Sequence, residues 1–398
     1  MKKRGLLLIV IYLAFISLGL PDSLLGAGWP SMYNDLAVPA YFAGVISMIV
    51  AGGTVVSSLV SVRFIDRFGI GAVTTFSVFL TAIALLGFSY SHHFIFLCLL
   101  AVPLGLGAGC VDAGLNNYVA LHYEARHMNW LHCFWGIGAA IGPLIMARHL
   151  ASGQSWTSGY NTVAWIQICL VIVLVISVPL WIKNSKGQDS EEGSGGRASL
   201  KILLAVPGLK QALAVFFCYC TIEATFGLWG ASYLVFMRDF EPGNAASYVS
   251  IYYIGITLGR FLSGFMTVKL SNQQLVYAGQ GLIILGLITL SLPFNATLFP
   301  GFFLIGFGCA PIFPSLLHET PQNFGQKYSQ SIMGMQMASA YIGITLMPLL
   351  FGKLASWFSY TFLLWFIGAV LAIKIYLTYD LNRRVLTEKT IVDKMDLT

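Results

Sequence analysis

Three acidic residues stand inside long apolar stretches of the sequence: Asp22, Asp112 and Glu223. A charged carboxylate at the centre of a membrane helix costs about 2.5–3.5 kcal/mol, so such residues are rarely without a role. A carboxylate escapes that cost when it binds a proton, and it releases the proton again when water reaches it. These surroundings predict that the three acids couple proton movement to another process. An acid that only hydrogen-bonds a neighbouring helix would give the same pattern.

A polar face follows Asp112 on the same stretch. Asn116 lies four residues after it, and residues at this spacing share one face of a helix. A carboxylate beside an amide offers hydrogen-bond partners to hydroxyl groups, which suits a sugar or a similar polar solute. Asn117 is turned about 100° further round the helix, and we expect it to contribute less. Asp22 is a second acid that we expect to contact the solute.

Four further residues are candidates for contact with a polar solute. His132 could relay a proton or donate to a hydroxyl group, and it could equally be a histidine at a helix end. Gln336 could supply a second amide or could hydrogen-bond a neighbouring helix. Trp135 and Trp229 could stack on a sugar ring, although tryptophan is also common at membrane interfaces.

Membrane-spanning helices must position these residues. The chain has 398 residues, of which 57% are hydrophobic and 10% charged, and its mean hydropathy is +0.78. Soluble proteins carry about 25% charged residues, so the composition excludes an ordinary soluble protein. The apolar runs are continuous and far longer than the roughly ten residues of a membrane strand, which excludes a β-barrel. Twelve runs are long enough to cross a bilayer as helices: 5–33, 41–62, 71–90, 94–121, 130–150, 161–183, 207–237, 245–269, 274–293, 297–318, 327–352 and 357–379.

The twelve runs form two sets of six. Similar short segments recur in the two sets at positions about 201 residues apart. The glycine-rich run from Gly105 to Cys110 in the first set matches the run from Gly306 to Cys309 in the second. Such duplication is typical of secondary transporters whose site lies between two halves. We therefore expect an all-α polytopic membrane protein with twelve transmembrane helices in two pseudo-symmetric six-helix bundles. The predicted division is an N-terminal bundle over 1–183, a cytoplasmic linker over 184–204, a C-terminal bundle over 205–380 and a cytoplasmic tail over 381–398.

Lysine and arginine are unevenly distributed between the two sides of the predicted membrane. With the N-terminus in the cytoplasm, eighteen fall on the inner side, three on the outer side (Arg148, Arg238 and Lys353), and Lys374 lies inside the last run. Cytoplasmic loops are enriched in basic residues, so we expect both termini in the cytoplasm and the chain in the cell membrane. The seven cysteines all fall within apolar runs without the spacing of a metal site, and we expect no bound metal.

The loop over 62–69, with the sequence VRFIDRFG, resembles the Asp-Arg-x-Gly loop motif of the major facilitator superfamily. Gly259-Arg260 resembles the counterpart of that motif in the second half. The basic run that usually completes the motif is absent after it. The resemblance implies the major facilitator fold, with Asp66, Arg67 and Arg260 in gating at the inner helix ends.

A narrower resemblance is to the fucose–galactose–glucose:proton symporter family and the related sodium-dependent glucose transporters. It rests on segments 20–26 (LPDSLLG), 104–117 (LGLGAGCVDAGLNN) and 131–139 (LHCFWGIGA). In that family an acid in the first helix and one in the fourth carry proton coupling and substrate contact, which implies these roles for Asp22 and Asp112. The family acid in the fourth helix is commonly a glutamate. Asp112 has a shorter side chain, which changes the distance between the carboxylate and the substrate.

The sequence thus predicts a proton-coupled symporter of a sugar or a similar small polar solute, working by alternating access. We expect no cofactor, no nucleic-acid partner, and a monomer in the lipid bilayer. Sodium in place of the proton is one alternative. A drug or metabolite/proton antiporter is another, because 138–143 (GAAIGP) matches part of the antiporter signature Gly-x-x-x-Gly-Pro. An enzyme is not expected, since motifs such as Gly-x-Ser-x-Gly and His-Glu-x-x-His are absent.

Overall fold

The computed structural model describes residues 2–395 apart from 124, 182–202, 205 and 268, so the predicted linker over 184–204 lies almost wholly outside the described residues. The N-terminal half contains, in chain order, α1 (Lys2–Asp22), α2 (Leu24–Asp35), η1 (Ala40–Phe42), α3 (Ala43–Phe68), α4 (Ile70–Tyr90), α5 (Phe94–His122), α6 (Ala125–Ala151), α7 (Trp156–Ser177) and η2 (Val178–Leu180). The C-terminal half contains α9 (Leu209–Arg238), α10 (Pro242–Met266), α11 (Asn272–Ser291), η3 (Asn295–Thr297), α12 (Leu298–Cys309), α13 (Ile312–Phe324), α14 (Gln326–Trp357) and α15 (Phe362–Met395).

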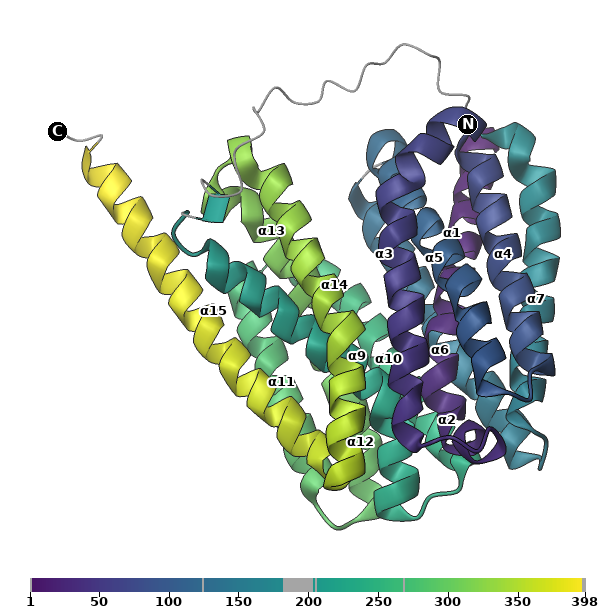
Figure 1. The fold of residues 1–398 in the computed structure, drawn as a ribbon. Coiled ribbons are helices and arrows are strands. Elements are labelled where there is room, and N and C mark those ends of the chain that lie inside the picture. Colours follow the sequence, from purple (N-terminus) through teal and green to yellow (C-terminus); the bar gives the residue numbers. More distant parts are fainter. Residues whose placement is uncertain (1, 124, 182–202, 205, 268, 396–398) are drawn as a thin grey trace.

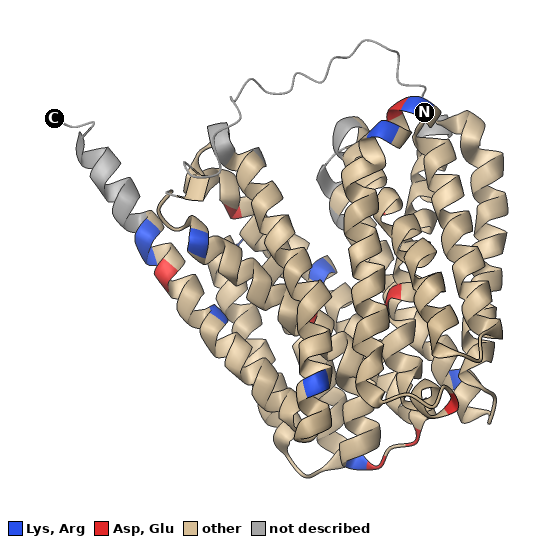
Figure 2. Cartoon of the chain, viewed as in Figure 1, with Lys and Arg blue, Asp and Glu red and all other residues tan. Residues whose placement is uncertain are grey.

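Twelve helical stretches of the described chain are long and apolar enough to cross a membrane, and no strand occurs among the described residues. This confirms the all-α fold with twelve transmembrane helices. Large apolar side chains such as Leu59, Phe76 and Trp365 are exposed on the outer surface, as expected for contact with lipid. Charged residues lie mostly near the helix ends and are few between them (Figure 2). The protein is therefore a multi-pass membrane protein.

Several helix boundaries differ from the sequence prediction, among them the start of α7 and the end of α15. The helix α7 begins at Trp156 rather than at 161, because the Ser155 side chain accepts a hydrogen bond from the Thr157 backbone N–H at 3.3 Å and caps the helix. The helix α15 continues to Met395, so much of the predicted tail over 381–398 extends the last transmembrane helix. That extension contains neither glycine nor proline to end it.

The helices form two bundles, α1 to α7 in one and α9 to α15 in the other (Figure 1). Both termini lie at the same end, where the bundles diverge, and the bundles come together at the opposite end. There, Gly44 at the start of α3 packs against Leu349 of α14, and Gly243 at the start of α10 packs against Ala151 at the end of α6. The two bundles are therefore closed against each other at the end away from the termini.

The contact at Gly26 of α2 requires glycine. A Cβ atom there would lie 2.4 Å from the backbone oxygen of Gly227 in α9. A backbone oxygen cannot swing aside as the end of a flexible side chain can, so any larger residue must push the two bundles apart.

We expect Gly26→Ala to open the closed end. The measurement is the distance between spin labels at Ser152 and Asn244, two exposed positions on opposite bundles near this end, by double electron–electron resonance. The distance should increase in Gly26→Ala. It should stay unchanged in the control Gly52→Ala, because a Cβ atom at Gly52 meets no atom within 4 Å. An unchanged distance in Gly26→Ala would show that this contact does not hold the bundles together.

Two spans are interrupted within the membrane. The first is interrupted at Ser23, between α1 and α2, where the Ser23 hydroxyl donates a hydrogen bond to the Ala139 backbone oxygen of α6 at 2.7 Å. The tenth is interrupted between α12 and α13, where Pro311 has no backbone N–H to donate. Interrupted membrane helices commonly border binding sites near the midplane. Asp22 stands immediately before the first interruption.

Candidate functional site between the bundles

Four side chains form a polar network across the interface between the bundles, which we call the interface network: Asp22, Trp135, Arg260 and Glu223. Trp135 Nε1 on α6 donates a hydrogen bond to Asp22 Oδ2 at the end of α1, over 2.8 Å. The Arg260 guanidinium of α10 lies over the Trp135 ring, with its Cζ 5.0 Å from the ring centroid. Arg260 also pairs with Glu223 of α9, with Nη2 3.6 Å from Oε1. The network thus joins an acid of the N-terminal bundle to an acid of the C-terminal bundle.

Close helix packing brings Trp135 to Asp22. A Cβ atom at Gly19, about one turn before Asp22 on α1, would lie 2.0 Å from the Trp135 backbone oxygen, so α1 and α6 touch there without an intervening side chain. Asp22 is exposed although it lies within the first membrane span. Because its partner Trp135 faces Arg260 of the other bundle, the exposed carboxylate faces the interface and not the lipid.

Glu223 is held by two tyrosines of its own bundle. Tyr219, one turn earlier on α9, donates its hydroxyl hydrogen to Glu223 Oε2. The Tyr252 hydroxyl of α10 donates to the Glu223 backbone oxygen at 3.2 Å. The Arg260 and Glu223 side chains are only 14% and 20% exposed, so the pair is largely removed from bulk water. Removing one partner of such a pair leaves the other charge uncompensated.

Asp112 and Asn116 form a second polar group on α5. Asn116 Nδ2 donates to Asp112 Oδ1 at 2.9 Å and to the Asp112 backbone oxygen at 3.0 Å, as the four-residue spacing predicts. Asn116 Oδ1 has no hydrogen-bond partner among the described residues. The carboxylates of Asp112 and Asp22 are close enough to interact electrostatically. The Asn116 amide oxygen is therefore a buried acceptor without a partner in the described part of the chain.

His132 adjoins the interface network from the N-terminal bundle. It lies one turn before Trp135 on α6 and is partly buried. Its ring packs edge-on against Phe15 of α1, with centroids 6.1 Å apart, and it interacts electrostatically with Arg260.

Three residues of the predicted solute-binding set take no part in the interface network, and their contact with a solute stays a prediction. Trp229 is 0% exposed in the core of the C-terminal bundle, where its Nε1 donates to the Pro348 backbone oxygen at 2.8 Å. Gln336 is 2% exposed and accepts a hydrogen bond from the Thr320 hydroxyl at 2.9 Å. This bond joins α14 to α13, as expected for the alternative in which Gln336 hydrogen-bonds a neighbouring helix. Asn117 is exposed on α5, turned away from Asn116.

The three predicted gating residues do not lie together. Asp66 and Arg67 are exposed at the end of α3, and the Arg67 Cζ lies 5.4 Å from the centroid of the Phe68 ring. Neither takes part in an ion pair with another described residue. Arg260 lies six residues before the end of α10 and belongs to the interface network instead.

Two tyrosines of the site, Tyr219 and Tyr252, are not among the predicted residues. Tyr219 precedes Glu223 by four residues, a spacing that places both on one helix face, so this contact had a signal in the sequence. The contact from Tyr252 joins residues 29 positions apart, and only the packing of α10 on α9 reveals it.

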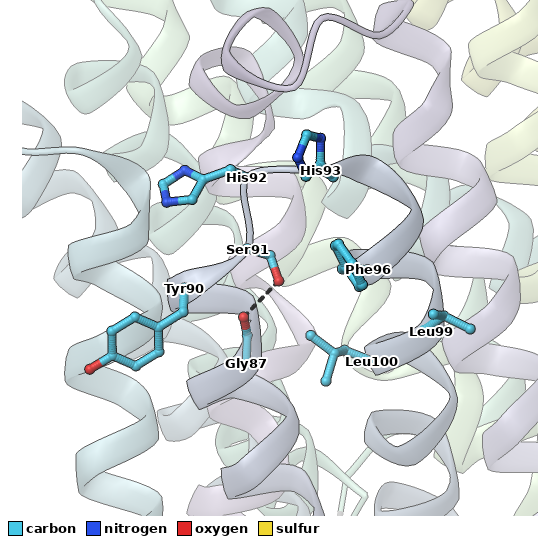
Figure 3. Close-up of a pocket in the computed structure, with 8 residues that line it drawn as sticks. All are labelled: Gly87, Tyr90, Ser91, His92, His93, Phe96, Leu99 and Leu100. Carbon is cyan, nitrogen blue, oxygen red and sulfur yellow. Dashed lines mark hydrogen bonds between the residues drawn. The ribbon is translucent and has the colours of Figure 1, made fainter.

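A surface pocket lies apart from the interface network, at the turn between α4 and α5 (Figure 3). His92 and His93 line it, and the Ser91 hydroxyl donates to the Gly87 backbone oxygen at 2.7 Å. Within the part of the chain that the structure describes, no three His, Cys, Asp or Glu residues group as metal ligands. This pocket therefore adds no chemistry to the site.

The comparisons with known proteins agree with this architecture. The model of the Major Facilitator Superfamily matches residues 11–336. The glucose/mannose transporter GlcP of Bacillus subtilis (strain 168) is 25% identical over 304 residues, which are 74% of each chain. A bacterial homologue of the human lysosomal transporter Spinster, in an inward-facing and occupied conformation, has a TM-score of 0.75 at 12% identity and covers 99% of this chain and 98% of its own. The transporter FucP in the outward conformation has a TM-score of 0.65 at 14% identity, covering 94% and 98%.

Proposed function

Because the chain belongs to the Major Facilitator Superfamily, we propose that this transporter is a proton-coupled symporter of a sugar or a similar small polar solute. The printed names of its relatives support the solute class, since they include a glucose/mannose transporter. The main support for proton coupling is the interface network. In this network an exposed acid of the N-terminal bundle, Asp22, is joined to a largely buried acid of the C-terminal bundle, Glu223.

Asp22 is the proposed coupling residue. As a carboxylate it accepts the Trp135 N–H in a charge-assisted hydrogen bond, and binding a proton weakens that bond. The Trp135 ring also lies under Arg260 of the other bundle. Trp135 therefore contacts both Asp22 and the C-terminal bundle. A change of charge at Asp22 alters the position of this side chain and so links proton binding to the relative position of the two bundles.

The solute is proposed to bind between Asp22 and the Asp112–Asn116 pair. Sugar hydroxyl groups are hydrogen-bond donors, and the carboxylate oxygens and the Asn116 amide oxygen are acceptors. The bundles are closed at the end away from the termini, so the solute would reach this site from the end of the termini. With both termini in the cytoplasm, as the basic residues predict, this conformation is the inward-facing one.

Uptake into proteoliposomes tests the proposal. The purified protein is reconstituted and offered a panel of radiolabelled hexoses under an imposed pH gradient, with and without a proton ionophore and with and without sodium. We expect saturable accumulation of at least one hexose that the ionophore abolishes and sodium does not change. Sodium-dependent uptake would instead assign a sodium symporter, solute expulsion against protons would assign an antiporter, and the lack of any saturable flux would refute the proposal.

Asn116→Ala should raise the KM for the transported hexose about fivefold, because a neutral hydrogen bond contributes about 0.5–1.5 kcal/mol. The change removes both the free amide oxygen and the donor to Asp112. The measurement is the concentration dependence of initial uptake. Asn244→Ala, at an exposed position in the first turn of α10, is the control and should keep the wild-type KM. A wild-type KM in Asn116→Ala would remove this residue from the site.

A further inference from the structure

The C-terminal bundle encloses a second polar group, which the interface network does not use. Lys374 of α15 is 0% exposed and Gln280 of α11 is 2% exposed. Neither Lys374 Nζ nor Gln280 Oε1 has a hydrogen-bond partner among the described residues. Buried polar atoms in native proteins almost always have a partner. Two such atoms, one a donor and one an acceptor, therefore point to a ligand between α11 and α15.

Thr378 places the two residues at the same helix contact. Gln280 Nε2 donates to the Thr378 hydroxyl at 3.2 Å, and that hydroxyl donates to the Lys374 backbone oxygen at 2.7 Å. Lys374 and Thr378 are four residues apart, so they share one face of α15. Lys374 and Gln280 thus belong to the same contact between α11 and α15.

No acidic residue in the described part of the chain forms an ion pair with the Lys374 amine. The ionisable groups that act on Lys374 are the thiols of Cys309 on α12 and Cys218 on α9, and both cysteines are buried. An ammonium group buried without a hydrogen-bond partner costs several kcal/mol, so the Lys374 amine requires an acceptor.

We propose that Lys374 and Gln280, positioned by Thr378, hold an enclosed water molecule inside the C-terminal bundle. The chemistry of the two unpartnered atoms selects this ligand. An anion would face the acceptor oxygen of Gln280, and a cation would face the amine of Lys374. Water accepts from the amine and donates to the amide oxygen, which gives both atoms a partner.

Radiolytic hydroxyl-radical footprinting with mass spectrometry tests the site in the full-length protein, because radicals formed from an ordered water oxidise the side chains beside it. Cys309 is 0% exposed, and we expect its oxidation to be about tenfold faster than that of Met146, which is also 0% exposed but packs against Gly28 and Gly159. The double variant Lys374→Met/Gln280→Leu removes both partners of the water, and Cys309 oxidation should then fall to the level of Met146. Equal oxidation of Cys309 and Met146 in the wild-type protein would overturn the proposal.

A double-mutant cycle on thermal stability gives an independent readout. Removing one partner of a buried polar contact leaves the other unsatisfied, whereas removing both is nearly neutral. The summed loss of Tm in Lys374→Met and Gln280→Leu should therefore exceed the loss in the double variant. Additive losses would contradict a shared ligand. A rise of Tm with chloride that Lys374→Met abolishes would assign an anion to the site and overturn the proposal.

Discussion

Arg260→Met should lower the rate of coupled uptake about a hundredfold while the protein remains folded. Methionine has a similar length but no charge, so Glu223 loses its counter-ion and Trp135 loses the cation above its ring. Removing one partner leaves the Glu223 charge uncompensated, and a hundredfold loss of rate corresponds to a transport barrier raised by about 2.8 kcal/mol. The measurement is the initial uptake of the transported hexose per amount of monodisperse protein.

Another ion pair, on the exposed side of α15, offers a matched control. Arg384 and Asp380 pair on α15 with Nε 2.9 Å from Oδ2, but Arg384 is 51% exposed. Exposed pairs contribute about 0–1 kcal/mol, so Arg384→Met should leave uptake within roughly twofold of the wild type. Arg260→Lys keeps the charge but not the planar group that stacks on Trp135, and it should restore only part of the rate. Wild-type uptake in Arg260→Met would show that the interface network does not carry the transport cycle.

The twelve spans could be predicted because each apolar run is long and is separated from the next by polar residues. Their ends could not be predicted to the residue, because caps decide them locally. Ser155 starts α7 five residues before the predicted position, and no comparable signal ends α15 where the apolar run stops. The interruption at Ser23 follows Pro21, yet prolines also occur inside uninterrupted helices here, such as Pro143 of α6, so the residue type alone does not predict it.

The candidate site was most predictable where a residue type is costly in a membrane. Asp22 and Glu223 stand out for that reason, and the structure places both in the interface network. Trp229 and Gln336 were chosen by residue type and by position in the repeat, and both face the interior of their own bundle. A membrane helix that is apolar on all faces carries no periodic signal for the side that faces a partner helix.

Asp22→Asn should abolish accumulation of the hexose driven by a pH gradient while preserving exchange of hexose across the membrane. Asparagine keeps an oxygen that can accept the Trp135 N–H, so the contact between α1 and α6 survives. It cannot bind and release a proton, so the gradient no longer drives the cycle. Accumulation should fall to the level seen with a proton ionophore, and counterflow, measured as uptake of labelled hexose into vesicles preloaded with unlabelled hexose, should stay within about threefold of the wild type.

Two companion variants separate the possible roles of this acid. Asp22→Leu removes the acceptor oxygen as well as the proton site, so it should lose counterflow together with accumulation. Asp112→Asn tests the other acid, whose side chain already accepts a hydrogen bond from Asn116. If Asp22→Asn still accumulates hexose and Asp112→Asn does not, the coupling proton belongs to Asp112, and Asp22 serves only to hold Trp135. If both asparagine variants accumulate hexose normally, neither acid carries the proton. Loss of accumulation in both variants, with counterflow retained in each, would mean that the two acids act together, consistent with their electrostatic interaction across the N-terminal bundle.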